Sequence, residues 1–427
     1  MRVASINAAR IDDDPSITGL PGTMSSNTAL RGWRRVLADF GPTYAANGFI
    51  GCLFAATGPV AIILSVATRG GLTEAEIASW LFGVFFINGL ITIFFCLRYR
   101  QPLAFFWTIP GTVLVGTALS HLRFAEVIGA YYATGVLMLV LGTTGWVTRA
   151  MKSVPMPIVM GMVAGVFLRF GLDLVRSLHA DIAIAGPMVL AWLVLSAMPA
   201  VGRRLPPLIG ALLVGVAAIV VLGRVDVSAL GAIEMARPVM QAPEWSWAAM
   251  VELVVPLAIT VLVVQNGQGF AVVKAAGHEP PVDAITIACG VGAIVSATVG
   301  SISTCLTGPT NAILTASGER ERQYTAGIVT GILAIAFGLM APAFTRLLLN
   351  APKAFIMALA GLAMLRVLQA AFVASFASRH TLGALVCMLV TLADYSLLNI
   401  GAAFWGLIAG FAVSWLMERG DFAAASR

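Results

Sequence analysis

Two short stretches decide the fold of this chain: WTIPGT at residues 107–112 and STCLTGPT at residues 303–310. Both place polar and helix-breaking residues inside runs that are otherwise apolar enough to span a membrane. In hydrocarbon an unsatisfied backbone group costs several kcal/mol, so a broken helix persists only where protein covers it or where it lines a water-filled site. We therefore expect the two breaks to mark the place where a solute binds.

The composition predicts a polytopic membrane protein. Of the 427 residues, 59% are hydrophobic and 11% are charged, and the mean hydropathy is +0.92. A soluble core of this length could not bury so much apolar surface. The net charge of +6 comes from basic residues in ones to threes between apolar runs, which indicates membrane topology and not nucleic-acid binding. Five cysteines without CxxC spacing indicate neither a disulfide framework nor a metal site.

Apolar segments of bilayer-spanning length divide into seven before and seven after a more polar connection. We expect a disordered cytoplasmic tail at 1–36, a first repeat at 37–223, a periplasmic connection at 224–246, a second repeat at 247–417 and a cytoplasmic tail at 418–427. The fourteen predicted spans are roughly 40–68, 73–97, 102–119, 124–146, 153–174, 183–199, 207–223, 247–276, 282–299, 301–317, 324–346, 354–374, 380–397 and 399–417.

The distribution of basic residues predicts the orientation. With the N-terminus inside, fourteen lysines and arginines lie at cytoplasmic ends and eight lie at outer ends. The positive-inside rule therefore favours two cytoplasmic termini and an even number of spans. The inner set is Arg31, Arg34, Arg35, Arg98, Arg100, Arg149, Lys152, Arg203, Arg204, Lys274, Arg320, Arg322, Arg379 and Arg419, and the outer set is Arg69, Arg123, Arg169, Arg176, Arg224, Arg237, Arg346 and Lys353.

Seven spans per half is an odd number, so two halves of the same fold must be inverted relative to each other. Each break falls in the third span of its half, as expected of a transporter built from repeats. Pro110 and Pro309 suit the first turn of a half-helix, where a missing N–H does no harm. Two facing helix N-termini would form an anion site without lysine or arginine. A single break of this kind is more often a kink, but two at matching positions favour a site.

Four runs resemble one known family: FWTIPGTVLVGTAL (106–119), PMPIVMGMVAGVFLRFGL (155–172), LPPLIGALL (205–213) and QNGQGFAVVKAAGHEPPV (265–282). The chain resembles the benzoate:proton symporter family of bacterial inner membranes over residues 40 to 417. This resemblance implies an architecture similar to uracil permeases and sulfate-permease-type anion transporters, with spans 1–4 and 8–11 as a core and spans 5–7 and 12–14 as a gate. Family members tend to have a Tyr/Ser-rich segment where this chain has FAATGP (54–59), so the substrate stays open.

Candidate substrate-binding residues lie at the breaks and in the eighth span. They comprise amides, hydroxyls, a glycine and aromatic side chains, for which ordinary helix packing is the alternative role. No carboxylate lies near the breaks, and Glu252 and Asp394 are weak candidates for a proton carrier. We expect no metal and no cofactor. The substrate-binding set is Phe54, Trp107, Thr108, Gly111, Gln265, Asn266, Gln268, Ser303, Thr304 and Thr307.

The sequence predicts a secondary active transporter of a small organic anion in the bacterial inner membrane. Moving one negative charge inward against 100 mV costs about 2.3 kcal/mol, and a co-transported proton cancels that cost. The resemblance makes proton symport of benzoate or a similar aromatic carboxylate the first hypothesis. An uncoupled anion channel or facilitator, or a transporter of another small solute, is the alternative. The chain has no HExxH, GxSxG or Walker sequence, so we expect neither an enzyme nor an ATP-driven pump. A homodimer is compatible with the sequence.

Overall fold

The computed structural model describes residues 34–147, 155–198, 201, 205–224, 234–393, 395, 397 and 402–425. Residues 1–40 and 41–427 are separate units, and every element below belongs to the second. Most of the predicted N-terminal tail and Asp394 lie outside the described residues.

The first half of the described chain is helical apart from one short strand. Its elements are α2 (Pro42–Ala56), α3 (Gly58–Arg69), α4 (Glu74–Phe82), the π-helix η1 (Gly83–Ile87), α5 (Asn88–Tyr99), β1 (Phe105–Trp107), α6 (Ile109–Ala118), α7 (Phe124–Thr143), α9 (Met156–Ala180), α10 (Ile182–Ala197) and α12 (Pro207–Val221).

The second half again contains one short strand among helices. Its elements are α13 (Trp247–Ala249), the π-helix η3 (Met250–Val254), α14 (Val255–Ile259), the π-helix η4 (Thr260–Gln265), α15 (Asn266–Ala275), α16 (Val282–Ala297), β2 (Thr304–Leu306), α17 (Gly308–Thr315), the 3₁₀-helix η5 (Arg320–Arg322), α18 (Tyr324–Leu339), α19 (Ala341–Leu349), α20 (Lys353–Phe376), α21 (Thr381–Ala393), α22 (Ala402–Met417) and α23 (Arg419–Ala425).

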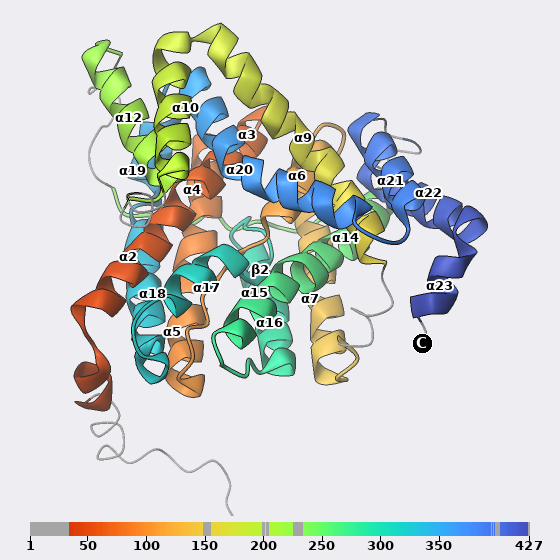
Figure 1. The fold of residues 1–427 in the computed structure, drawn as a ribbon, viewed down its shortest axis with the longest axis horizontal. Coiled ribbons are helices and arrows are strands. Elements are labelled where there is room, and N and C mark those ends of the chain that lie inside the picture. The colour runs from red at the N-terminus through yellow and green to blue at the C-terminus, as the bar shows by residue number, and fades with distance from the viewer. Residues whose placement is uncertain are drawn as a thin grey trace, which may run out of the picture. The chain divides into compact units, whose positions relative to one another are not determined.

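The described part is a mostly helical, multi-span membrane protein. Seven helical stretches are long and apolar enough to cross a bilayer, and further apolar helices are shorter. Helices far apart in sequence pack together, as α9 does along α20 and α16 along α7 (Figure 1). The seven long stretches are Pro42–Arg69, Glu74–Tyr99, Phe124–Thr143, Met156–Ala180, Trp247–Ala275, Arg320–Leu339 and Lys353–Phe376.

Two predicted spans each consist of two helices in the structure and not of one continuous helix. The first, 40–68, breaks at Thr57, which has φ −97° and ψ −104° and separates α2 from α3. The second, 324–346, ends as α18 at Leu339, and α19 begins at Ala341. In both cases a proline, Pro59 or Pro342, occupies the first turn of the following helix. Proline cannot donate a backbone hydrogen bond to the preceding turn, so the helix restarts there.

The two break motifs lie side by side although they are far apart in the sequence. β1 pairs with β2 in antiparallel register, with Phe106 opposite Cys305. Backbone bonds at both ends extend the pair, from Thr108 N to Ser303 O at 3.3 Å and from Thr307 N to Ala104 O at 3.2 Å. Each strand leads directly into a short helix, α6 or α17, as the break motifs predict. The strand pair therefore fixes where both helices begin.

Two asparagines hold the edges of this strand pair. Asn266 Oδ1 accepts a hydrogen bond from Leu306 N at 2.8 Å, and Asn311 Oδ1 accepts one from Ala104 N at 2.9 Å. Both asparagines are fully buried. Since a two-stranded ribbon leaves backbone groups unpaired on both edges, these amides complete its hydrogen bonding inside the protein.

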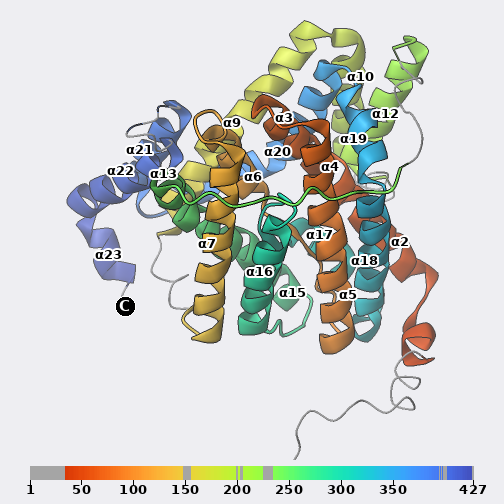
Figure 2. The same ribbon diagram turned by 180° about the vertical axis from the view of Figure 1, so that it is seen from behind.

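Residues 234–246 cross the ends of several helices as an extended strap (Figure 2). Because its contacts reach helices from both halves, the strap ties those helix ends together. Four backbone N–H groups of the strap donate hydrogen bonds to these helices: Ala236 N to Leu339 O at 2.8 Å, Val239 N to Ser79 Oγ at 2.9 Å, Gln241 N to Thr298 O at 2.8 Å and Glu244 N to Ala125 O at 2.9 Å.

Candidate functional site

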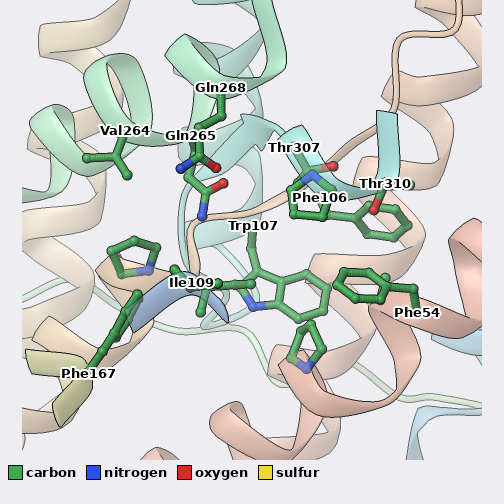
Figure 3. A pocket seen from close by; sticks show the side chains of 15 residues that line it. Phe54, Phe106, Trp107, Ile109, Phe167, Val264, Gln265, Gln268, Thr307 and Thr310 are labelled. Atoms are coloured by element: carbon green, nitrogen blue, oxygen red, sulfur yellow. The ribbon is translucent and has the colours of Figure 1, made fainter. Parts of the chain in front are cut away.

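A cavity lies at the two helix breaks (Figure 3). Its empty volume, counting the open mouth, is about 540 Å³. Pro110 and Pro309 both border it, so the first turns of α6 and α17 face one space. The lining residues are Phe54, Ala55, Pro59, Phe106, Trp107, Ile109, Pro110, Phe167, Val264, Gln265, Gln268, Thr307, Pro309, Thr310 and Val367.

The first turn of α6 is capped by its own side chain. Thr108 Oγ1 accepts a hydrogen bond from Gly111 N at 3.1 Å and donates one to Thr260 Oγ1 at 3.1 Å. A Cβ on Gly111 would lie 2.4 Å from Thr108 Cγ2, so this tight cap requires glycine. The cap satisfies one of the N–H groups that a helix start leaves without an intrahelical acceptor.

The first turn of α17 has no such cap. Thr307 precedes the helix, but its hydroxyl makes no capping bond and instead lies 3.5 Å from Ala104 O. A Cβ on Gly308 would lie 2.8 Å from Gln268 Cβ, so α17 starts in close contact with α15. The uncapped N–H groups and the positive end of the helix dipole make this helix start a better anion acceptor than α6.

Trp107 lines the cavity and carries a buried hydrogen-bond donor. The residue is 1% exposed, and its indole Nε1 is buried without a hydrogen-bond partner among the described residues. Its ring packs edge-on against Phe85, with centroids 5.3 Å apart. An indole N–H can only donate, and a buried unpaired donor costs about 1–3 kcal/mol. A ligand acceptor or a water in the cavity would remove that penalty.

Amides and aromatic rings form the remaining walls. Figure 3 shows Gln265 and Gln268 above Trp107, with Phe167 and Phe54 to its two sides. Gln265 is 6% exposed, and neither glutamine amide bonds to another group in the described part of the chain. None of the lining residues is charged. The site is therefore aromatic, and hydroxyls, amides, one indole and helix ends supply its polarity.

Five of the predicted site residues line this cavity, namely Phe54, Trp107, Gln265, Gln268 and Thr307. Thr108 and Gly111 lie directly behind it and form the α6 cap. Asn266 does not reach it, because its amide is bonded to the β2 backbone.

Ser303 and Thr304 also lie away from the cavity. Both are fully buried, and neither hydroxyl has a hydrogen-bond partner in the described structure. Thr304 packs against α16, where a Cβ added to Gly292 would lie 2.4 Å from its Oγ1. Of the predicted residues Asn266, Thr108 and Thr304, none is among those that line the cavity, whereas Gln265 is.

Ten lining residues were missing from the predicted set, among them Phe167, Val367 and Thr310. Phe167 comes from α9 and Val367 from α20, and as apolar residues in apolar helices they carry no local signal. Thr310 follows Pro309 within the second break motif and could have been included for that reason. Asn311, which clamps the backbone before β1, was also missed, although a buried amide one turn into a half-helix is a detectable signal.

A helical bundle with discontinuous spans that meet at one internal cavity defines a membrane transport protein. Solved structures share the fold. The murine Slc26a9 anion transporter in the inward-facing state superposes with a TM-score of 0.62 at 15% identity, covering 96% of this chain and 76% of that chain. The transmembrane domain of the cyanobacterial bicarbonate transporter BicA gives a TM-score of 0.55 at 14% identity, covering 86% and 97%.

Sequence comparison gives the particular family. The chain belongs to the benzoate membrane transport protein family, whose model matches residues 38–416. It is 33% identical over 374 residues to the inner membrane protein YdcO of Escherichia coli, covering 86% of this chain and 94% of that protein. It is 28% identical over 386 residues to the benzoate membrane transport protein of Acinetobacter baylyi, covering 89% and 96%. The chain is thus a transport protein and not an enzyme.

Proposed function

We propose that this protein is a secondary active transporter that moves benzoate or a similar aromatic carboxylate together with a proton across the bacterial inner membrane. The unpaired indole N–H of Trp107 in an aromatic, uncharged cavity carries the proposal. Family membership and the name of the Acinetobacter relative support the substrate class.

The cavity suggests how such an anion is held. The carboxylate accepts hydrogen bonds from Trp107 Nε1 and from the uncapped first turn of α17. The ring lies among Phe54, Phe106 and Phe167, where it replaces water at an apolar wall. Because the lining carries no positive side chain, a second carboxylate would be buried without a partner. The site should therefore select monocarboxylates over dicarboxylates.

Proton coupling follows from the membrane potential. An anion moving inward against 100 mV meets a cost of about 2.3 kcal/mol, which one co-transported proton cancels. We therefore propose a stoichiometry of one proton to one anion, with no net charge moved.

The proposed architecture has fourteen spans in two inverted repeats, 37–223 and 247–417, with both termini in the cytoplasm and residues 224–246 outside. The strand-then-helix units β1–α6 and β2–α17 support the repeat, because each follows two apolar helical stretches in its half. Spans 1–4 and 8–11 would form the core and spans 5–7 and 12–14 the gate. In that division Phe167 and Val367 are gate residues, so the cavity lies where core and gate meet.

Two alternatives differ in measurable ways. An uncoupled anion channel or facilitator would use the same cavity without a proton, and a transporter of another solute would ignore benzoate. Uptake of labelled carboxylates and nucleobases into proteoliposomes tests all three. Symport predicts that benzoate uptake rises with an inward acid gradient and changes little when valinomycin clamps the potential. Uptake that follows voltage and ignores pH would instead identify a channel.

A further inference from the structure

Two carboxylates are buried among the described residues, Asp173 and Glu252. Asp173 lies between two guanidinium groups, with Arg69 at 2.6 Å and Arg176 at 3.1 Å. Arginine does not release its proton in proteins, so Asp173 is a fixed charge held in an ion-pair cluster. It cannot load and unload a proton without leaving two guanidinium groups unpaired.

Glu252 has a different partner. Its Oε2 lies 2.8 Å from His121 Nε2, and the two side chains are 4% and 15% exposed. Histidine is the side chain that ordinarily exchanges a proton between about pH 5 and 8. The pair is net neutral with that proton and carries −1 without it. The partial exposure of His121 gives the proton a route to water.

The pair connects two of the spans that line the cavity. His121 follows α6, whose first turn contains Pro110, and Glu252 lies in the span that continues to Gln265. Along that span Glu252 and Gln265 are 13 residues apart, about 20 Å at 1.5 Å per residue. Glu252 also sits within the π-helix η3, Met250–Val254. Short π-helical turns within α-helices occur frequently at functional sites.

Other titratable groups around the pair come from few elements. The elements packed against η3 are α6, α7, α13, α14 and α22. Of these, α6, α13, α14 and α22 contain no titratable side chain. α7 carries Glu126, Tyr131 and Tyr132, and at its start Arg123 pairs with Glu126 and with Glu244 of the strap. Ser120 Oγ lies 3.2 Å from His121 Nδ1 and helps to orient the ring.

We propose that the His121–Glu252 pair is the proton-binding site of the transport cycle, an inference that rests on the proton symport proposed above. In the loaded carrier the protonated pair is neutral and the bound anion contributes −1. In the empty carrier the pair has lost its proton and itself carries −1, so the two forms bear the same charge. Because the two forms cross in opposite directions, the effects of the membrane potential on the two crossings cancel, and the cycle is electroneutral. The pair acts at a distance from the anion, through the two spans that it joins.

The test compares coupled and uncoupled transport in proteoliposomes. His121→Arg keeps an ion pair with Glu252 but removes the exchangeable proton, and Glu252→Gln removes the charge. A gradient of one pH unit stores about 1.36 kcal/mol per proton, which supports about tenfold accumulation of benzoate. We expect both variants to lose this tenfold accumulation while retaining exchange of labelled for unlabelled benzoate at equal pH. His179→Gln, a change at an exposed histidine, is the matched control and should accumulate benzoate like the wild type.

The outcomes separate the two proposals. A wild-type protein that ignores the pH gradient refutes proton symport itself, whatever the variants do. A responsive wild type with equally responsive variants overturns the assignment to His121 and Glu252. Variants that melt like the wild type but lose exchange as well as accumulation would also overturn it, since the pair would then serve transport in general. If His121→Arg does not fold, His121→Gln and Glu252→Gln decide the result by the same criteria.

Discussion

Replacing Trp107 with phenylalanine tests the proposed anion contact, because it removes the indole N–H and keeps an aromatic wall. A hydrogen bond to a charged partner contributes about 1.5–3 kcal/mol, which corresponds to about a 10- to 150-fold weaker Kd for benzoate. The free protein should not lose a hydrogen bond, because Nε1 has no partner there among the described residues. Calorimetric titration of the purified protein with benzoate measures the change.

Trp80→Phe is the matched control for this experiment. Trp80 is fully buried and its Nε1 also lacks a partner in the described structure, but it does not line the cavity. Both variants lose similar buried ring area, so their melting temperatures should shift alike. Only Trp107→Phe should weaken binding. A Trp107→Phe protein that binds benzoate within twofold of the wild type, or a Trp80→Phe protein with the same loss, would refute the assigned contact.

Three further predictions concern stability and topology. Asn266→Ala leaves Leu306 N without its acceptor and should lower the free energy of unfolding by about 1–3 kcal/mol in a denaturation experiment; an unchanged value would show that the clamp is dispensable. Glu418 accepts bonds from Leu382 N and Gly383 N, and although partial burial opposes the shift, these bonds hold its pKa below the ordinary 4.5. The contribution of ionised Glu418 to the free energy of unfolding should therefore be present above about pH 4.5 and be lost as the pH falls through the folded-state pKa. The melting temperature should fall over the same pH range, and Glu418→Gln should flatten this dependence. A single cysteine at Glu234, in a protein without the five native cysteines, should react with an impermeant thiol reagent from outside the cell; labelling only after permeabilisation would contradict the proposed orientation.

The sequence alone determined where the two half-helices α6 and α17 begin. Proline and glycine act on the backbone within one turn, so Pro110 and Pro309 mark the starts of α6 and α17 before any tertiary contact is known. The strength of the apolar signal likewise determined the membrane class, because no soluble core could bury so many apolar residues. Trp107 and Thr307 were identified for the same local reason, as cavity residues next to a break.

Only the tertiary structure decided which neighbouring side chains face the cavity. Gln265 lines it while Asn266 holds β2, because adjacent residues on a helix point about 100° apart and the π-helix η4 shifts the helical register before them. Thr304 faces α16 because the pairing of β1 with β2 fixes the direction of each strand residue. Phe167 and Val367 join the site through the packing of α9 and α20 against the breaks, a contact between helices that no local pattern encodes.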